Sequence, residues 1–267
     1  MASDSEPKVT RLPSTGPVPA PDLKKKGGSD KLFDEPRDLI TDFAFNADTV
    51  AVFDDMVDRS VPYYQEIQRM ACELAADFST NGGTVYDLGC STATTLTALD
   101  RIVDPSVPFI GVDNSADMLD VARQKFRETG SVRKVGFINA DLQGPFAVED
   151  ASVVMMLLSL MFVRPLHRHK LMKRIYDGMR PEGALILVEK ITIGDTLLNR
   201  LFIKNYYDYK RRHGYSEMEI AQKREALENV LIPYRFEENV ELLREIGFRQ
   251  VDQFFRWYNF SGIVAVK

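Results

Sequence analysis

The sequence predicts an α/β fold: a Rossmann-like, mostly parallel sheet of seven strands, with an antiparallel C-terminal hairpin and a helical insertion before the last helix. Three observations predict it. Short β-branched or apolar runs alternate with segments of helix length, the pattern of a parallel sheet with helices on both faces. A glycine turn follows the first run, where open α/β sheets bind their ligands. The last two runs are joined by a short connection, which indicates a hairpin.

The first elements are expected to be helices. Residues 1–32 are rich in Pro, Ser, Lys and Gly and have no apolar periodicity, so we predict a disordered tail. Two helices are expected over 48–58 and 60–78. Ser60 would cap the second helix and Pro62 would occupy its first turn.

The rest of the chain supplies the sheet and its insertion. The insertion, residues 191–230, is expected to hold two helices, of which the second opens with a capping box of Ser216 and Glu219. The last helix is placed at 236–246 and ends at Gly247. Strands are expected at 84–88, 109–113, 135–139, 152–158 and 184–189, and the hairpin at 250–257 and 262–267.

Composition limits the classes of protein to which the chain can belong. With 267 residues, 45% of them hydrophobic, the chain can form a single domain over 33–267. The net charge of −5 argues against a surface built as a whole to hold nucleic acid. Cys72 and Cys90 lie outside disulfide or metal spacing, so we expect no metal and a reducing compartment, the cytoplasm. We expect no membrane contact, because no run approaches the roughly 20 apolar residues of a bilayer span.

A turn and a carboxylate indicate a bound nucleoside. Residues 86–93 (Y-D-L-G-C-S-T-A) connect the first strand to the next helix, and Asp113 lies at the tip of the second strand, where it can accept from both ribose hydroxyls. A dinucleotide pyrophosphate needs G-x-G-x-x-G, but Ser91 and Thr94 stand at the later glycine positions. S-adenosylmethionine (SAM) carries no phosphate, so one obligatory glycine, Gly89, is adequate. The pattern favours SAM.

Weaker features agree with a SAM site. Asp141 follows the third strand, where its carboxylate could reach the adenine amino group, and residues 179–184 resemble the LxPGG turn of class I methyltransferases. For Asp113 and Asp141 the alternative is a role in a helix N-cap. Cys90 is better explained as a small buried side chain than as a reactive thiol, because no basic residue adjoins it in sequence.

Four segments resemble the carboxy-S-adenosylmethionine synthase family, within the class I SAM-dependent methyltransferase superfamily. They are F-D-D-M-V-D-R-S-V-P-Y-Y from Phe53, V-Y-D-L-G-C-S from Val85, V-D-N-S from Val112 and G-Y-S-E-M-E-I-A-Q-K-R from Gly214. The match runs from about residue 43 to the end of the sequence. The last string discriminates, because generic methyltransferases share the glycine turn but not this insertion.

The resemblance implies a function and its residues. In that family prephenate supplies carbon dioxide to SAM as it becomes phenylpyruvate. A partner enzyme uses the product, carboxy-SAM, on the wobble uridine of tRNA, so this chain itself would not bind RNA. The resemblance places Tyr64 against the cofactor and Arg224 at the carboxylate of the product. It assigns the methionyl part to Gly89, Cys90 and Ser91, the ribose to Asp113 and Asn114, and the adenine to Asp141 and Leu142.

Arg224 also stands out from the residue pattern alone. It lies at helical spacing with Ile220, Leu227 and Leu231, so a guanidinium is predicted in an otherwise apolar stripe. A buried cation needs a partner, and arginine binds a carboxylate bidentately. The alternative is that Arg224 snorkels or pairs with Glu228.

The chain departs from the family near the cofactor. Ala93 stands where the family usually has glycine, which would tighten or shift the turn, and Leu157 replaces an asparagine, which removes a hydrogen bond.

His167 and His169 are two residues apart, so on a helix they cannot form an i, i+4 metal pair. The implied chemistry needs positioning more than acid or base catalysis, which agrees with the lack of a recognisable catalytic dyad.

Two other functions stay open at this point. A methyltransferase acting on a small anionic substrate would use Arg224 for that substrate's carboxylate. An RNA adaptor would use basic and aromatic side chains of the insertion, but Phe202, Tyr206 and Tyr209 also fit a core or dimer stripe, and we expect a homodimer. The adaptor candidates are Lys204, Lys210, Arg211, Arg212, Tyr206, Tyr207 and Tyr209.

Overall fold

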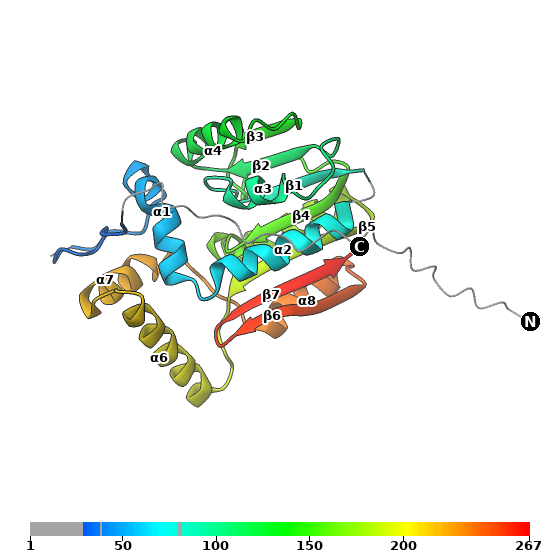
Figure 1. Ribbon diagram of the computed structural model, residues 1–267. Coiled ribbons are helices and arrows are strands. Elements are labelled where there is room, and N and C mark those ends of the chain that lie inside the picture. Colours follow the sequence, from blue (N-terminus) through cyan, green and yellow to red (C-terminus); the bar gives the residue numbers. More distant parts are fainter. Residues whose placement is uncertain (1–28, 38, 80–81) are drawn as a thin grey trace, which may run out of the picture.

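The computed structural model describes residues 29–37, 39–79 and 82–267, and the strands form one seven-stranded sheet (Figure 1). They are β1 (Thr84–Leu88), β2 (Phe109–Asp113), β3 (Val135–Asn139), β4 (Ala151–Leu157), β5 (Met179–Lys190), β6 (Gln250–Trp257) and β7 (Phe260–Val266). The strand order is β3-β2-β1-β4-β5-β7-β6. β1 to β5 pair in parallel, and β7 runs antiparallel to β5 and β6. The predicted sheet with its antiparallel hairpin is confirmed.

Helices pack on both faces of this sheet. One core cluster joins the central strands to Leu171 and Ile175 of α5 and Leu243 of α8, and the other joins them to Ala71 of α2 and Leu96 of α3, all at most 1% exposed. The helices are α1 (Ala47–Ser60), α2 (Tyr64–Phe78), α3 (Thr94–Leu99), α4 (Ala116–Glu128), the 3-10 turn η2 (Leu160–Phe162), α5 (Pro165–Gly178), α6 (Thr196–Arg212), α7 (Glu217–Leu227) and α8 (Phe236–Ile246). None of these helices in the described chain has the length and apolar character needed to cross a bilayer.

The predicted start of the second helix is wrong. Ser60 is the last residue of α1, where its hydroxyl donates to the Met56 carbonyl oxygen, and α2 begins only at Tyr64. Pro62 explains the break, because a residue that precedes proline is disfavoured in the helical region. Val61 is accordingly extended, with φ −106° and ψ 117°. The turn lets α1 and α2 take different directions (Figure 1).

The boundary of the predicted tail is also wrong by a few residues. The part of the prediction that covers residues 1–28 lies outside the described residues. Asp30, inside the predicted tail, is 3% exposed and lies 3.4 Å from the Lys223 ammonium nitrogen of α7. Its carboxylate also accepts a hydrogen bond from the Tyr215 hydroxyl at 2.5 Å. Residues 29–37 therefore pack against the insertion instead of standing apart from the domain.

The insertion forms two helices, as predicted. The hydroxyl and backbone N–H of Ser216 each donate to the Glu219 carboxylate at 2.7 Å, and the Glu219 N–H donates back to the hydroxyl at 3.2 Å. This capping box opens α7. Figure 1 shows α6 and α7 beside α1 at one end of the sheet, which is the end where the parallel strands have their carboxyl termini.

Candidate active site

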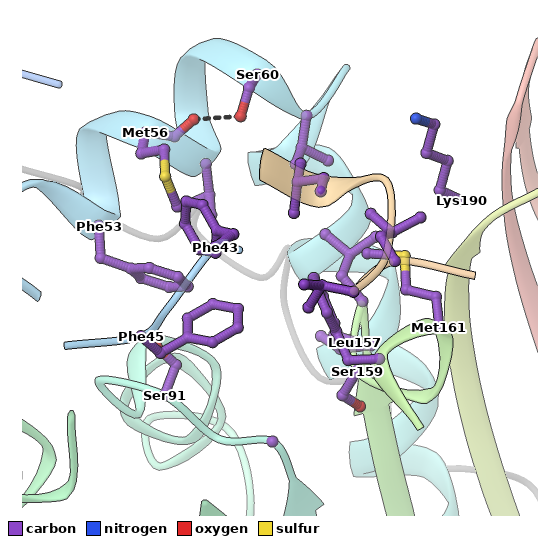
Figure 2. Close-up of a pocket in the computed structure, with 18 of the residues that line it drawn as sticks. Phe43, Phe45, Phe53, Met56, Ser60, Ser91, Leu157, Ser159, Met161 and Lys190 are labelled. Atoms are coloured by element: carbon purple, nitrogen blue, oxygen red, sulfur yellow. Dashed lines mark hydrogen bonds between the residues drawn. The ribbon is translucent and has the colours of Figure 1, made fainter. Parts of the chain in front are cut away.

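A cavity of about 700 Å³ lies at the carboxyl ends of the parallel strands. Figure 2 shows Phe43, Phe45 and Phe53 together on one side of it, with Leu157 and Met161 on the other. Cavities that hold cofactors and small substrates have volumes of roughly 300–1,000 Å³. This one has room for a nucleoside and a second small molecule.

Every residue to which a site role was assigned from the sequence lines this cavity. The residues come from α2, from the ends of three parallel strands and from α7, so the fold collects them from distant parts of the chain. They are Tyr64, Gly89, Cys90, Ser91, Asp113, Asn114, Asp141, Leu142 and Arg224. Their contacts with a ligand stay predictions.

The turn after β1 is held against β2 by its own backbone. The N–H groups of Gly89 and Cys90 both donate to the Val112 carbonyl oxygen, at 2.7 and 3.1 Å. Gly89 has φ +83°, and a Cβ there would lie 2.5 Å from the Cβ of Ser159. Ala93, where the family usually has glycine, sits in the left-handed region at φ 57° just before α3. Alanine is thus tolerated there with a backbone strain of about 1–2 kcal/mol.

Asp113 joins the tip of β2 to this turn. Its Oδ2 accepts from the Ser91 N–H and its Oδ1 from the Ser115 N–H, both at 2.9 Å. The N-cap of α4 is Ser115, whose side chain accepts from the Met118 N–H, so the capping alternative for Asp113 is not what the structure shows. Burial raises the pKa of Asp113, and the backbone N–H donors offset part of that rise. Each oxygen keeps a lone pair, so the carboxylate can still accept from ribose hydroxyls.

Asp141 and Leu142 form the wall after β3. The Asp141 side chain is exposed and accepts from the Gln143 N–H at 2.8 Å, while its carbonyl accepts from the Gly144 N–H at 2.9 Å. These bonds make a turn, and no helix follows directly, so the N-cap alternative is wrong here as well. Leu142 is half-buried in the same wall.

Tyr64 and Cys90 line the buried side of the cavity. The Tyr64 hydroxyl accepts from the Gln68 side-chain amide at 3.1 Å, and burial, with the Asp54 carboxylate nearby, raises its pKa. Cys90 is 5% exposed, and burial raises the pKa of its thiol well above the usual range. A neutral, buried thiol of this kind is a packing group, as the sequence indicated.

Asp87 is a site residue that the sequence analysis passed over. It is 3% exposed and lines the cavity beside Gly89. Burial, together with the neighbouring Asp113 carboxylate, raises the pKa of Asp87 to about 7. The sequence shows that Asp87 belongs to the D-L-G turn. It does not show that Asp87 is buried, because that burial results from the packing around β1.

Arg224 lines the cavity, but not for the reason predicted. The helix α7 buries Ile220, Gln222, Lys223 and Ala226, whereas Arg224 is exposed at the cavity rim. The buried face is rotated because residues 29–37 cover it. The Gln222 amide donates to backbone oxygens in that segment at 2.9 and 3.0 Å. Arg224 does line the cavity together with Leu227 and Leu231 of the predicted stripe, but the predicted burial of its guanidinium is wrong.

Arg224 is nevertheless available to a ligand. The alternative pairing with Glu228 is not found, and within the described ranges Arg224 makes no ion pair or side-chain hydrogen bond. Three lysines that the sequence analysis did not select for this site, Lys190, Lys210 and Lys223, line the cavity with it. The α6–α7 end of the cavity thus has four basic residues and one acidic residue, Glu228, whereas the β1–β2 end carries carboxylates.

The histidines do not belong to this cavity. His167 and His169 lie on α5, and neither lines it. Over the stretches that the structure describes, no three His, Cys, Asp or Glu side chains come together in a way that could hold a metal ion.

Comparison with known proteins identifies the family. The carboxy-S-adenosyl-L-methionine synthase of Methylococcus capsulatus is 50% identical over 239 residues, which cover 89% of this chain and 99% of that protein. The chain belongs to the carboxy-S-adenosyl-L-methionine synthase family. The synthase of Wolinella succinogenes is 45% identical over 244 residues, covering 89% and 98% of the two chains.

The fold of this synthase family is shared more widely. A family model described as a methyltransferase domain matches residues 85–183. A putative SAM-dependent methyltransferase of Methanococcus maripaludis superposes with a TM-score of 0.56 over 85% of this chain and 95% of that one, at 17% identity. An O-methyltransferase family protein of Burkholderia thailandensis gives 0.56 over 84% and 64%, at 18% identity. These likenesses confirm the predicted class I methyltransferase fold.

The packing of the glycine turn can be tested by substitution. Gly89→Ala is expected to destabilise the protein by about 1–3 kcal/mol more than Gly130→Ala, because only the first adds an overpacking cost. Gly130 is the matched control: it has φ +69°, and nothing lies within 4 Å of an added Cβ. Urea unfolding measures both variants. Equal losses would contradict the close approach of the turn to Ser159.

Proposed function

We propose that the protein is a carboxy-SAM synthase that converts SAM and prephenate to carboxy-SAM and phenylpyruvate. The observation that carries the proposal is the position of Arg224 in a chain of this family. Arg224 lines the same cavity as the glycine turn, and its guanidinium has no acidic partner among the residues described. A free guanidinium beside a bound sulfonium is suited to bind the new carboxylate.

The reaction requires the protein to position the two substrates and to place charged groups beside them. Prephenate loses carbon dioxide and hydroxide as its ring becomes aromatic, and the SAM methyl group exchanges a proton for that carbon dioxide, so water is the remaining product. Asp113 would hold the ribose, Gly89 would admit the methionyl part, and Arg224 would bind the transferred carboxylate. Fixed groups of this kind lower a barrier by orientation and electrostatic stabilisation.

Aromatic side chains over the turn support capture of carbon dioxide. Phe45 packs edge-to-face against Phe43, Phe53 and Phe162, with ring centroids 5.2, 6.3 and 5.4 Å away. All four rings line the cavity. Such a wall excludes water from the reacting carbon and slows the escape of a small neutral molecule. Leu157, which replaces the family asparagine, adds to the same apolar lining.

We also propose that the enzyme works in the cytoplasm as a homodimer and that a partner enzyme uses its product on tRNA. The absence of direct RNA binding is supported by ion pairs in the insertion, because basic side chains that pair with carboxylates are less available to phosphates. Lys204 pairs with Asp208, and Arg211 pairs with Asp208 and Glu217. Tyr206, one of the three residues of the predicted core or dimer stripe, is buried and therefore belongs to the core. A dimer surface is supported by exposed leucines at the start of α6, which are Leu197, Leu198 and Leu201.

The reaction is tested by incubating the protein with SAM and prephenate and weighing the nucleoside products. We expect SAM to gain one carboxyl group while phenylpyruvate forms in equal amount. The competing hypothesis, a methyltransferase with a small anionic acceptor, predicts no carboxylated SAM and methyl transfer to another acceptor. That second result would contradict the proposed function.

Arg224→Met tests the role of the guanidinium. The change removes a charge from an exposed side chain, so the fold should tolerate it. We expect carboxy-SAM to bind at least about tenfold more weakly, because a charge-assisted hydrogen bond contributes about 1.5–3 kcal/mol. Affinity for SAM should change little. Calorimetric titration of both nucleosides measures this, and a variant that binds the two as the wild type does would refute the assignment.

Asp87 makes SAM binding depend on pH. Its pKa of about 7 means that the carboxyl group is largely protonated below pH 7 in the free protein. A bound sulfonium favours the carboxylate, so binding releases a proton below pH 7, and affinity should rise up to about tenfold per pH unit before levelling off above it. Calorimetry between pH 5.5 and 8.5 would show this slope. The account of Asp87 is wrong if Asp87→Asn keeps the slope.

A further inference from the structure

The α6–α7 end of the cavity contains two lysines that form no ion pair, although the Asp30 carboxylate acts on one of them, Lys210, from a longer distance. Lys190 is the last residue of β5, and Lys210 lies in the last turn of α6. Lys223 of α7, by contrast, has the Asp30 carboxylate 3.4 Å away. Within the residues that the structure describes, neither the Lys190 nor the Lys210 side chain makes a hydrogen bond or ion pair.

Lys210 is buried and Lys190 is half-buried. Lys210 is 6% exposed, and burial, with Lys223 and Lys190 nearby, lowers its pKa well below the usual range. Burial also lowers the pKa of Lys190 to about 8. The effective penalty for an unpaired buried ion is several kcal/mol. Without a compensating anion, burial therefore favours the neutral forms of both lysines, and a bound anion would favour the charged forms.

An aromatic ring supplies only part of that compensation. The Nζ atoms of Lys190 and Lys210 lie 5.2 and 4.8 Å from the centroid of the Tyr206 ring. A cation–π contact contributes about 0.5–2 kcal/mol, less than the desolvation penalty. The shared ring places both lysines at the same end of the cavity, where an anionic ligand can be held by the two charges together.

Lys190 lies apart from the turn that would hold the nucleoside, and Lys210 shares the Tyr206 ring with it. Figure 2 shows Lys190 on the opposite side of the cavity from Ser91 and Phe45. A dicarboxylate such as prephenate gives up one carboxylate as carbon dioxide and keeps the other in phenylpyruvate. Arg224 is already assigned to the transferred group, which leaves the retained carboxylate without a cation.

We propose that Lys190 and Lys210 form an anion subsite that binds the retained carboxylate of the dicarboxylate donor. This inference rests on the proposed function for the identity of the donor. The two lysines are positioning and specificity residues: they hold the donor so that its departing carboxylate faces the SAM methyl group. They would also bind the 2-oxo acid product, which keeps the same carboxylate.

Charge removal separates this role from a structural one. In Lys190→Met and Lys210→Met we expect KM for prephenate and the inhibition constant of phenylpyruvate to rise about tenfold or more. Affinity for SAM should stay within about twofold of the wild type. The melting temperature should not fall, because each change removes a buried charge that has no partner. A structural ion-pair role predicts the reverse, a lower melting temperature with unchanged KM.

Two lysines of the same region serve as controls. Lys204→Met, on the exposed side of α6, should alter neither kinetics nor stability, because its side chain is 69% exposed and pairs only with Asp208. Lys223→Met should lower the melting temperature, because it leaves the Asp30 carboxylate buried without its cation. The contrast between Lys223 and the unpaired lysines is the signature expected of a ligand subsite.

Titration of the SAM-loaded protein with phenylpyruvate needs no turnover and separates the two proposals. Binding by the wild type that is lost in both variants supports the subsite, even if the wild type forms no carboxy-SAM, a result that would overturn only the proposed function. Equal binding by wild type and variants, or no binding by the wild type, would overturn the subsite.

Discussion

The site depends on one junction, the hydrogen bond from the Ser91 N–H to the Asp113 carboxylate at 2.9 Å. It ties the turn after β1 to the tip of β2, and the bonds from the Gly89 and Cys90 N–H groups to the Val112 carbonyl hold the same junction. The parallel register of β1 and β2 places these groups next to each other. The wall that we propose for the nucleoside therefore exists before any ligand binds, which is the preorganisation that binding and catalysis both need.

Around this junction the cavity separates opposite charges. Asp87 and Asp113 lie at the end formed by the strands, and the unpaired lysines and Arg224 lie at the end formed by β5, α6 and α7. A molecule that carries a sulfonium and gains a carboxylate matches both ends. In a low-dielectric cavity such complementarity has a larger effect than on the surface. Methyl transfer from SAM to an uncharged acceptor has no need of the cationic end.

Local motifs were predictable from sequence, and the features set by distant packing were not. The Gly89 turn, Asp113 and the capping box of α7 are encoded within a few residues each, and the structure shows all of them. The start of α2 was misjudged because Pro62 acts on the residue before it. The buried face of α7 was misjudged because residues 29–37 cover it, and the Lys190–Lys210 pair was missed because β5 and α6 meet only in three dimensions.

The central claim is that the cavity holds a sulfonium and a carboxylate on one ligand. The most direct measurement is the mass of the small molecule that co-purifies with the protein, released by denaturation and weighed against SAM. The account predicts SAM carrying one additional carboxyl group. S-adenosylhomocysteine as the retained nucleoside would contradict it, because that is the product of ordinary methyl transfer.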